Sequence, residues 1–165
     1  NSALPHAQPG NRKLEAGDVL VIDYGAVYGG YHSDETWTGI IGHADGRQRE
    51  IYGLVKDAHD RALEELKSGV IAKNIDFIAR SCIQNGGYGD YFSHGTGHGV
   101  GLDVHEAPRI SAPSETVLKT GMVVTIEPGI YIPDLWGMRI EDMALIKEDG
   151  FEILTKTSKD LRILG

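Results

Sequence analysis

Two short apolar segments of the chain each end on an acidic residue, and this pattern restricts both fold and chemistry. Residues 19–22 (Val-Leu-Val-Ile) precede Asp23, and residues 123–126 (Val-Val-Thr-Ile) precede Glu127. Their length and their β-branched side chains predict buried strands. We therefore do not expect Asp23 and Glu127 to be simple surface charges.

Each of these acids is followed by a second acid at a spacing that fits a β-hairpin. Asp34 follows Asp23, and Glu141 follows Glu127. Across an antiparallel ladder, facing Cβ atoms lie about 5 Å apart. Two hairpins that face each other would direct four carboxylates to one point.

Four carboxylates at one point repel one another unless cations neutralise them. Two like charges about 4 Å apart repel by roughly 4 kcal/mol at an effective dielectric constant near 20. Divalent ions would cancel this repulsion and would activate a water molecule. His98 adds an imidazole to the set, which suits Mn, Co, Zn or Fe in a hydrolase better than a thiolate zinc structure. Each acid alone would be a solvated or turn residue, so the hypothesis of a metal site depends on their combination. Asp142, next to Glu141, is either a solvated residue or supports a ligand.

His98 lies in a segment rich in glycine and histidine, residues 94–106 (HGTGHGVGLDVHE). Glycine at every second position from 95 to 101 disfavours a helix and favours an extended backbone close to a site or substrate. The histidines at 94, 98 and 105 then offer one metal ligand and two groups for hydrogen bonding or proton transfer. The alternative is a glycine loop with exposed histidines. The segment matches neither of the glycine-rich phosphate-binding motifs.

The remaining periodicity predicts an α+β fold in a single domain. Residues 18–41 predict a hairpin that reverses near Gly29 and Gly30, and residues 107–120, with two prolines, predict a loop. Apolar residues at helical spacing predict helices over 47–68 and 73–85. Further strands are expected near residues 122–127, 129–133, 138–147 and 151–154.

Composition narrows the classes of partner. The net charge of −8 argues against a nucleic acid or an anionic membrane as the main partner. No apolar run approaches the roughly 18–20 residues of a membrane span. Cys82 is the single cysteine, so no disulfide can form within the chain, and we expect a cytoplasmic protein.

Four motifs together resemble the proline-specific branch of the pita-bread metallopeptidases, the Xaa-Pro dipeptidases (prolidases) and aminopeptidases P. The motifs are residues 23–36 (DYGAVYGGYHSDET), 94–106, 127–131 (EPGIY) and 139–142 (RIED). They stand in the family's order, and the resemblance covers essentially the whole chain. It implies the pita-bread fold and a peptide substrate cut before proline by a hydroxide bound to two divalent ions. Mn or Co is the first choice, with Zn or Fe as alternatives.

The resemblance also implies roles for individual residues. Asp34 and Glu141 would bridge the two ions, Asp23 would complete one site, and His98 with Glu127 would complete the other. Glu127 would also shuttle a proton. The catalytic and substrate-facing set would further include His6, His94, His105 and Arg139.

By comparison with that family, we expect residues 1–165 to be one catalytic-domain fragment without the separate N-terminal domain and the start of the catalytic domain. We expect little activity from this fragment alone, and a homodimer is compatible with the full-length protein. A non-catalytic pita-bread domain that binds peptides or proteins is the main alternative, and creatinase-like chemistry is another. Both are disfavoured because all five ligand candidates are present. Dipeptidase and aminopeptidase activity both stay open.

Overall fold

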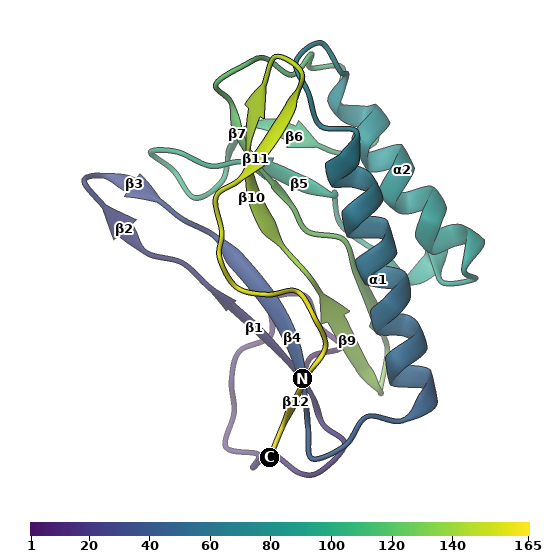
Figure 1. Cartoon of the computed structure of the whole chain (residues 1–165). Coiled ribbons are helices and arrows are strands. Elements are labelled where there is room, and N and C mark those ends of the chain that lie inside the picture. Colours follow the sequence, from purple (N-terminus) through teal and green to yellow (C-terminus); the bar gives the residue numbers. More distant parts are fainter.

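The computed structural model describes all of residues 1–165 and has an α+β fold, with two helices packed side by side along one side of the strands (Figure 1). This agrees with the predicted fold class. The strands are β1 (Val19–Tyr24), β2 (Val27–Tyr28), β3 (Tyr31–His32), β4 (Glu35–Ile41), β5 (Gly97–Gly99), β6 (Glu106–Ile110), β7 (Val123–Ile126), β8 (Gly129–Ile132), β9 (Trp136–Arg139), β10 (Asp142–Lys147), β11 (Gly150–Ile153) and β12 (Arg162–Leu164). The helices are α1 (Gly46–Glu64), α2 (Ala72–Asn85) and the short 3-10 turn η1 (Gly89–Tyr91).

The hairpin predicted over residues 18–41 is confirmed. Strand β1 pairs antiparallel with β4, and the β2–β3 ribbon extends the pair outward from the body (Figure 1). Gly29 and Gly30 form the tip with φ values of 57° and 86°, a region that glycine enters without steric cost. Strand β12 adds to β4 in parallel, which the sequence analysis did not predict.

A second sheet has the strand order β11-β10-β7-β5-β6. Its last strand corrects the loop expected over residues 107–120, because residues 107–110 belong to β6. Pro108 lacks a backbone N–H and therefore argued against a strand. It is tolerated because β6 is the edge of the sheet, where one side of the strand needs no partner.

The single strand expected near residues 138–147 is in fact two strands. Strand β9 ends at Arg139 and β10 starts at Asp142, and Glu141 between them forms an isolated bridge with Thr36 of β4. Strand β9 instead pairs with β8 in a separate ribbon. Strands β7 and β10 are antiparallel neighbours, and their register, which pairs Asp142 with Ile126, places Glu141 opposite Glu127 just beyond the ladder, as expected for this pair.

The two predicted helices are present, with α1 ending somewhat earlier than expected. Asp45 caps α1: its carboxylate accepts from the backbone N–H of Gln48 at 2.7 Å, and the Gln48 side chain accepts from the N–H of Asp45 at 2.9 Å. The apolar faces of both helices join the strands in one core of buried side chains. Neither helix is long and apolar enough to cross a membrane.

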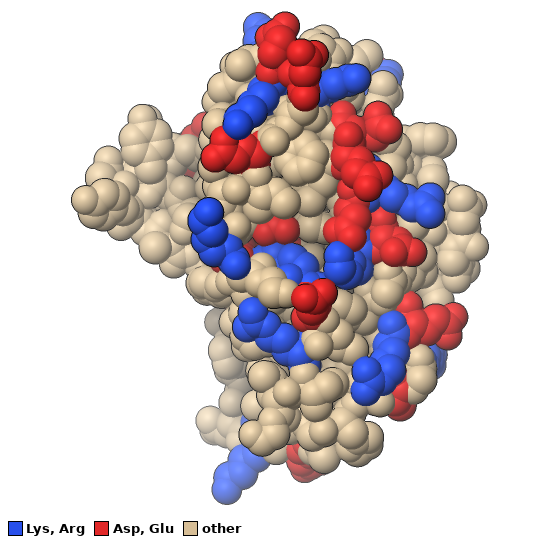
Figure 2. Space-filling model, viewed as in Figure 1, with Lys and Arg blue, Asp and Glu red and all other residues tan.

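Acidic and basic side chains are interspersed on the face shown in Figure 2. Along α1, for example, Lys56 and Asp60 form an ion pair at 2.6 Å. Pairs of this exposed kind contribute little to stability.

Candidate metal centre

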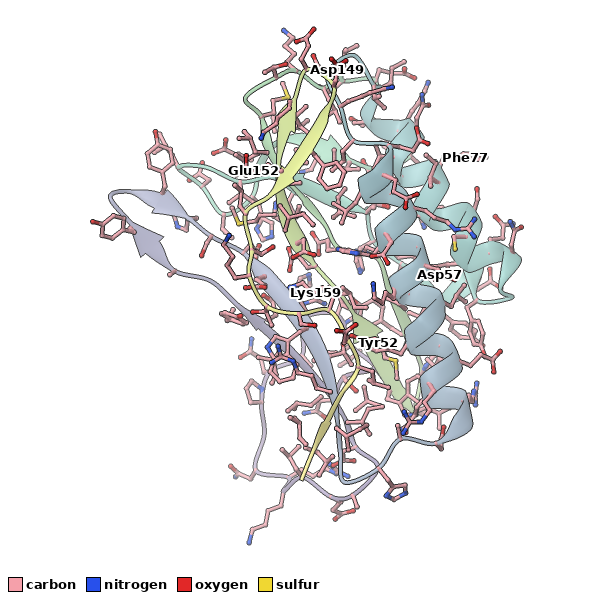
Figure 3. All side chains as sticks on the ribbon, viewed as in Figure 1. Tyr52, Asp57, Phe77, Asp149, Glu152 and Lys159 are labelled. Carbon is pink, nitrogen blue, oxygen red and sulfur yellow. The ribbon has the colours of Figure 1, made fainter.

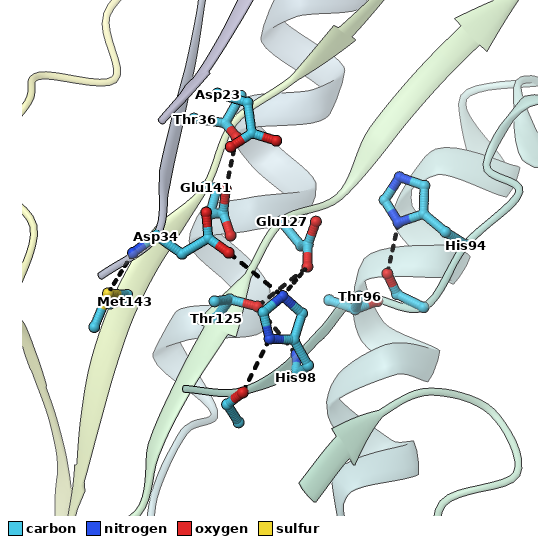
Figure 4. A network of polar contacts seen from close by, with 12 residues as sticks. Asp23, Asp34, Thr36, His94, Thr96, His98, Thr125, Glu127, Glu141 and Met143 are labelled. Atoms are coloured by element: carbon cyan, nitrogen blue, oxygen red, sulfur yellow. Dashed lines mark hydrogen bonds and ion pairs between the residues drawn. The ribbon is translucent and has the colours of Figure 1, made fainter. Parts of the chain in front are cut away.

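The five ligand candidates lie at strand ends that meet at one point. Asp23 lies in β1, His98 in β5, and the other three flank strands: Asp34 precedes β4, Glu127 follows β7, and Glu141 separates β9 from β10. Figure 4 shows Asp23, Asp34, His98, Glu127 and Glu141 converging from separate strands. Residues far apart in the chain are thus brought together, as the sequence analysis expected.

These side chains form two overlapping groups. Single ligand atoms of Asp23, Asp34 and Glu141 lie within 4.8 Å of one another, and so do those of His98, Glu127 and Glu141. Glu141 belongs to both groups. Asp34 also reaches the second group, because its Oδ2 lies 3.7 Å from His98 Nε2. Two adjacent cation sites that share Asp34 and Glu141 would use all five side chains.

Glu141 supplies the clearest test of whether the residues fit a metal. Its side chain is buried, and its Oε2 accepts a hydrogen bond from Thr36 Oγ1 at 2.6 Å. Its Oε1 is buried and has no hydrogen-bond partner. A buried carboxylate oxygen without a partner is costly and needs an explanation. An oxygen-rich donor set with one imidazole, aimed at the same place, fits divalent metal ions.

The electrostatics of the acids point in the same direction. Burial, followed by the charge of Asp23, raises the pKa of Asp34 from 3.8 to about 6. Burial and the charges of Glu127 and Asp34 raise the pKa of Glu141 well above its ordinary value. The protein therefore holds these carboxylates together against their repulsion, which bound cations would relieve.

His98 is oriented by its neighbours. Its Nδ1 lies 3.0 Å from the carbonyl oxygen of Gly99, and its Nε2 lies 3.1 Å from Glu127 Oε1. Burial lowers the pKa of His98, but the hydrogen bonds to Glu127 and Gly99 and the charges of Glu127 and Asp34 together outweigh it, so the net pKa is raised. Donation from Nδ1 to Gly99 leaves Nε2 as the atom that would bind a metal, and binding would displace the proton shared with Glu127.

The glycines beside His98 are explained by close approach of neighbouring strands. A Cβ on Gly97 would lie 1.9 Å from the carbonyl oxygen of Thr125, and one on Gly99 would lie 2.3 Å from that of Ala107. Strand β5 thus runs between β7 and β6 with no room for side chains at these positions. The prediction of an extended backbone here is confirmed.

Arg139 connects several parts of the site. Its guanidinium donates to Asp23 Oδ2 at 2.6 Å, to the Tyr131 hydroxyl at 2.9 Å and to the carbonyl oxygen of Pro5 at 3.1 Å. The Arg139 side chain is only 3% exposed, so these contacts are fixed. Arg139 therefore orients Asp23 and holds the segment that carries His6.

The three further histidines expected at the site all lie near it, but in different settings. His94 is occupied at both ring nitrogens, by the carbonyl of Gly95 at 2.8 Å and by the Tyr131 hydroxyl at 3.0 Å. Both ring nitrogens of His94 are thus hydrogen-bonded within the wall of the small cavity. His105 is exposed, with its ring centroid 4.3 Å from that of His98, and His6 is exposed at the rim of the cavities.

A buried network that the sequence analysis missed supports the segment around His94. Asp76 of α2 is buried and accepts from Arg80 and from both the N–H and the hydroxyl of Thr96. Arg80 also donates to the carbonyl oxygens of Phe92 and His94, both within 2.9 Å. The Thr96 carbonyl in turn accepts from the N–H of Glu127 at 2.7 Å. An acid and a base four residues apart on α2 were the available signal.

Two cavities adjoin the five ligand candidates. The larger, of about 1120 Å³, runs along β1 and the N-terminal segment. The smaller, of about 310 Å³, contains His6, His94, His98 and His105 together with Arg109 and Arg139. Arg109 was not singled out from the sequence. It stands opposite His98 in the β5–β6 ladder and adds a positive charge to this cavity, which Glu127 also lines.

Comparison with known proteins agrees with this geometry. The family model "Metallopeptidase family M24" matches residues 1–148. The chain is 56% identical over 160 residues to an Xaa-Pro dipeptidase of Pyrococcus furiosus, covering 97% of this chain and 46% of the relative.

Solved structures give the same result for the fold. A prolidase from Thermococcus sibiricus superposes with a TM-score of 0.97 at 44% identity, over 99% of this chain and 45% of that one. An X-Pro aminopeptidase from Thermotoga maritima superposes with a TM-score of 0.96 at 42% identity, over 99% of this chain and 46% of that one. The chain thus spans a little under half the length of the relatives it matches.

Proposed function

Because the chain belongs to metallopeptidase family M24, whose members use divalent metal ions, we propose that it carries the catalytic site of an Xaa-Pro dipeptidase. The observation that carries the proposal is that Glu141 and Asp34 each reach both ligand groups. This arrangement supports two ions, held by Asp23, Asp34, His98, Glu127 and Glu141. Mn or Co is proposed first, with Zn or Fe as alternatives.

The proposed division of labour follows from the contacts. Ions bound here would polarise the scissile carbonyl and lower the pKa of a water molecule so that it becomes a nucleophile at neutral pH. Glu127 lies between His98 and Arg139, at 3.1 Å and 4.0 Å, and is placed to accept a proton from the attacking water and pass it to the leaving nitrogen. His105, exposed beside His98, is the group available to contact the substrate carbonyl.

The positive charge of Arg109 in the small cavity favours a dipeptidase over an aminopeptidase. A dipeptide keeps its free carboxylate close to the scissile bond, whereas a longer peptide has an amide there. Arg109 is exposed in the small cavity and is free to pair with such a carboxylate. An Xaa-Pro aminopeptidase is the second candidate, since the Thermotoga maritima relative carries that name. The non-catalytic alternative is disfavoured because the ligand set is complete.

The decisive experiment compares substrates and two matched variants of the complete protein with added Mn or Co. We expect hydrolysis of an Xaa-Pro dipeptide to exceed that of an Xaa-Pro tripeptide. Arg109→Met should raise the dipeptide KM by about 10- to 100-fold, the worth of one charged hydrogen bond. It should leave an amidated dipeptide unaffected, and Arg47→Met, an exposed change on α1, should change neither. Faster cleavage of the tripeptide would favour the aminopeptidase, and no hydrolysis with any metal would contradict the proposal.

A further inference from the structure

Each of the two shared carboxylates is followed in sequence by another acid on the opposite side of the strand. Glu35 follows Asp34, and Asp142 follows Glu141. Successive side chains of an extended backbone point in opposite directions, so Glu35 and Asp142 lie behind the candidate metal centre. Both are largely buried, with side chains 12% and 6% exposed.

The ammonium group of one lysine contacts both Glu35 and Asp142. Lys159 Nζ lies 2.6 Å from Glu35 Oε1 and 3.3 Å from Asp142 Oδ1, and the Lys159 side chain is only 7% exposed. Figure 3 labels Lys159 on the C-terminal segment that connects β11 to β12. Nothing in the mechanism proposed above uses this buried cation.

The segment that carries Lys159 is itself anchored. The Lys159 carbonyl accepts from the Tyr52 hydroxyl of α1 at 2.9 Å, and β12 pairs with β4 directly after it. Glu35 also accepts from the N–H of Thr157 at 3.0 Å. The contacts of Tyr52 and β12 are independent of the two acids and help to set the position of Lys159.

Asp142 is held from α1 as well. His59 Nε2 lies 3.3 Å from Asp142 Oδ2, and the Thr155 hydroxyl donates to Asp142 Oδ1. Both His59 and Asp142 are buried. Glu35 and Asp142 thus each accept at least one hydrogen bond, Glu35 from Lys159 and Asp142 from Thr155, whereas Glu141 Oε1 in the candidate metal centre accepts none.

The two strands that Lys159 joins belong to different sheets. Strand β4 lies in the sheet β1-β4-β12 and β10 in the sheet β11-β10-β7-β5-β6. Near the site, their backbone connection is the isolated bridge between Thr36 and Glu141. The Glu35–Lys159–Asp142 contacts form a second connection on the opposite side of the strands.

We propose that Lys159 is a positioning residue that fixes the spacing of Asp34 and Glu141, and so the affinity for the pair of metal ions they share. It acts through Glu35 and Asp142, one residue along the backbone from each ligand. This inference rests on the proposed function only in that metal ions bind at the five candidates. Without the ammonium group, Glu35 and Asp142 would repel each other and the strands carrying the ligands would separate.

The test is a calorimetric metal titration of the complete protein after its metal has been removed. Lys159→Met should weaken binding of the two metal ions by about tenfold or more, an effect comparable to the loss of a group that supports a metal ligand. Lys159→Arg keeps the charge and should restore most of the affinity. Lys156→Met is the matched control, because Lys156 is exposed on the same segment, and it should bind as wild type.

A second measurement separates positioning from general stability. With metal at saturation, Lys159→Met should lower kcat and leave KM within about twofold, because only the metal geometry changes. A variant that lowers the melting temperature of the metal-free protein but binds both ions with wild-type affinity would overturn the proposal. Should the methionine variant not fold, Glu35→Gln keeps Lys159 and removes one partner. Wild-type metal affinity in Glu35→Gln would equally overturn the proposal.

The wild-type protein distinguishes the two claims. If it binds two ions but does not hydrolyse Xaa-Pro peptides, the proposed function fails, while the titration still decides the role of Lys159. If it binds no divalent ion, both claims are contradicted.

Discussion

Thr36 and Glu141 contact each other twice, through side chains and through backbone. Thr36 Oγ1 donates to Glu141 Oε2 at 2.6 Å, and the Glu141 N–H donates to the Thr36 carbonyl at 3.0 Å. This double contact joins the two larger sheets at the point where the five ligand candidates meet. It also uses one oxygen of Glu141 and leaves the other facing the site.

The hydroxyl of Thr36 should therefore influence metal binding. Thr36→Val keeps the shape of the side chain but leaves Glu141 Oε2 without its donor, so metal affinity should fall by about tenfold or more. Thr36→Ser retains the hydroxyl and should bind metal nearly as wild type. Calorimetric titration of both variants checks this, and equal affinity in Thr36→Val and wild type would show that the contact has no such role.

The metal-free protein should lose stability as the pH rises through the range set by Asp34. Burial and the charge of Asp23 raise the pKa of Asp34 from 3.8 to about 6. In that interval the folded state keeps a proton that the unfolded state has released, so the free energy of unfolding decreases with pH. The contribution is at most about 3 kcal/mol.

Asp34→Asn removes the titrating group and is the comparison for this pH effect. Urea unfolding of the two metal-free proteins between pH 4 and pH 6 should give a steeper decline for wild type. Parallel declines would mean that Asp34 ionises normally in the folded protein. Saturating metal should remove this additional decline of the free energy of unfolding with pH from the wild-type protein.

The same substitution at two glycines should have opposite effects. A Cβ on Gly97 would lie 1.9 Å from the Thr125 carbonyl oxygen, whereas one on Gly53 in α1 would meet no atom within 4 Å. Gly97→Ala should destabilise by about 3 kcal/mol or more, and Gly53→Ala should stabilise by about 0.5–1 kcal/mol. Thermal unfolding measures both, and a stable Gly97→Ala protein would contradict the close packing of β5 against β7.

The hydrogen-bond network centred on Asp76 should contribute to the free energy of unfolding, although it lies outside the five ligand candidates. Asp76→Ala leaves Arg80 and the N–H of Thr96 without their buried acceptor. We expect a loss of about 1–3 kcal/mol, because the buried N–H of Thr96 loses its acceptor while Arg80 keeps two carbonyl partners. Asp57→Ala, an exposed change on α1 (Figure 3), should stay within about 0.5 kcal/mol of wild type. Similar unfolding midpoints for the two variants would contradict the role assigned to Asp76.

Local patterns were sufficient for several parts of this fold and site. Apolar runs ending in an acid identified Asp23 and Glu127, and alternating glycines identified the extended segment around His98. These signals are visible in short stretches of sequence, because burial of a strand and close approach of two backbones each restrict the side chains of a run of neighbouring residues. Hairpin spacing then indicated Asp34 and Glu141, and the resemblance to a family added their role as shared ligands, which the atomic distances support.

Other features depend on contacts between distant parts of the chain. Lys159 looks like any surface lysine in the sequence and is buried only because β12 returns to β4. Arg109 reaches the small cavity because β6 pairs with β5. Pro108 argued against a strand, and only its place at the sheet edge makes one acceptable. None of these placements is encoded by neighbouring residues.

The most direct test of the metal centre is anomalous X-ray diffraction from crystals of the protein loaded with zinc. We expect two metal positions, both in contact with Asp34 and Glu141. Asp23 would complete one and His98 with Glu127 the other, with metal–oxygen distances of about 2.0–2.2 Å. A single position, or metal bound away from Asp34 and Glu141, would contradict this expectation.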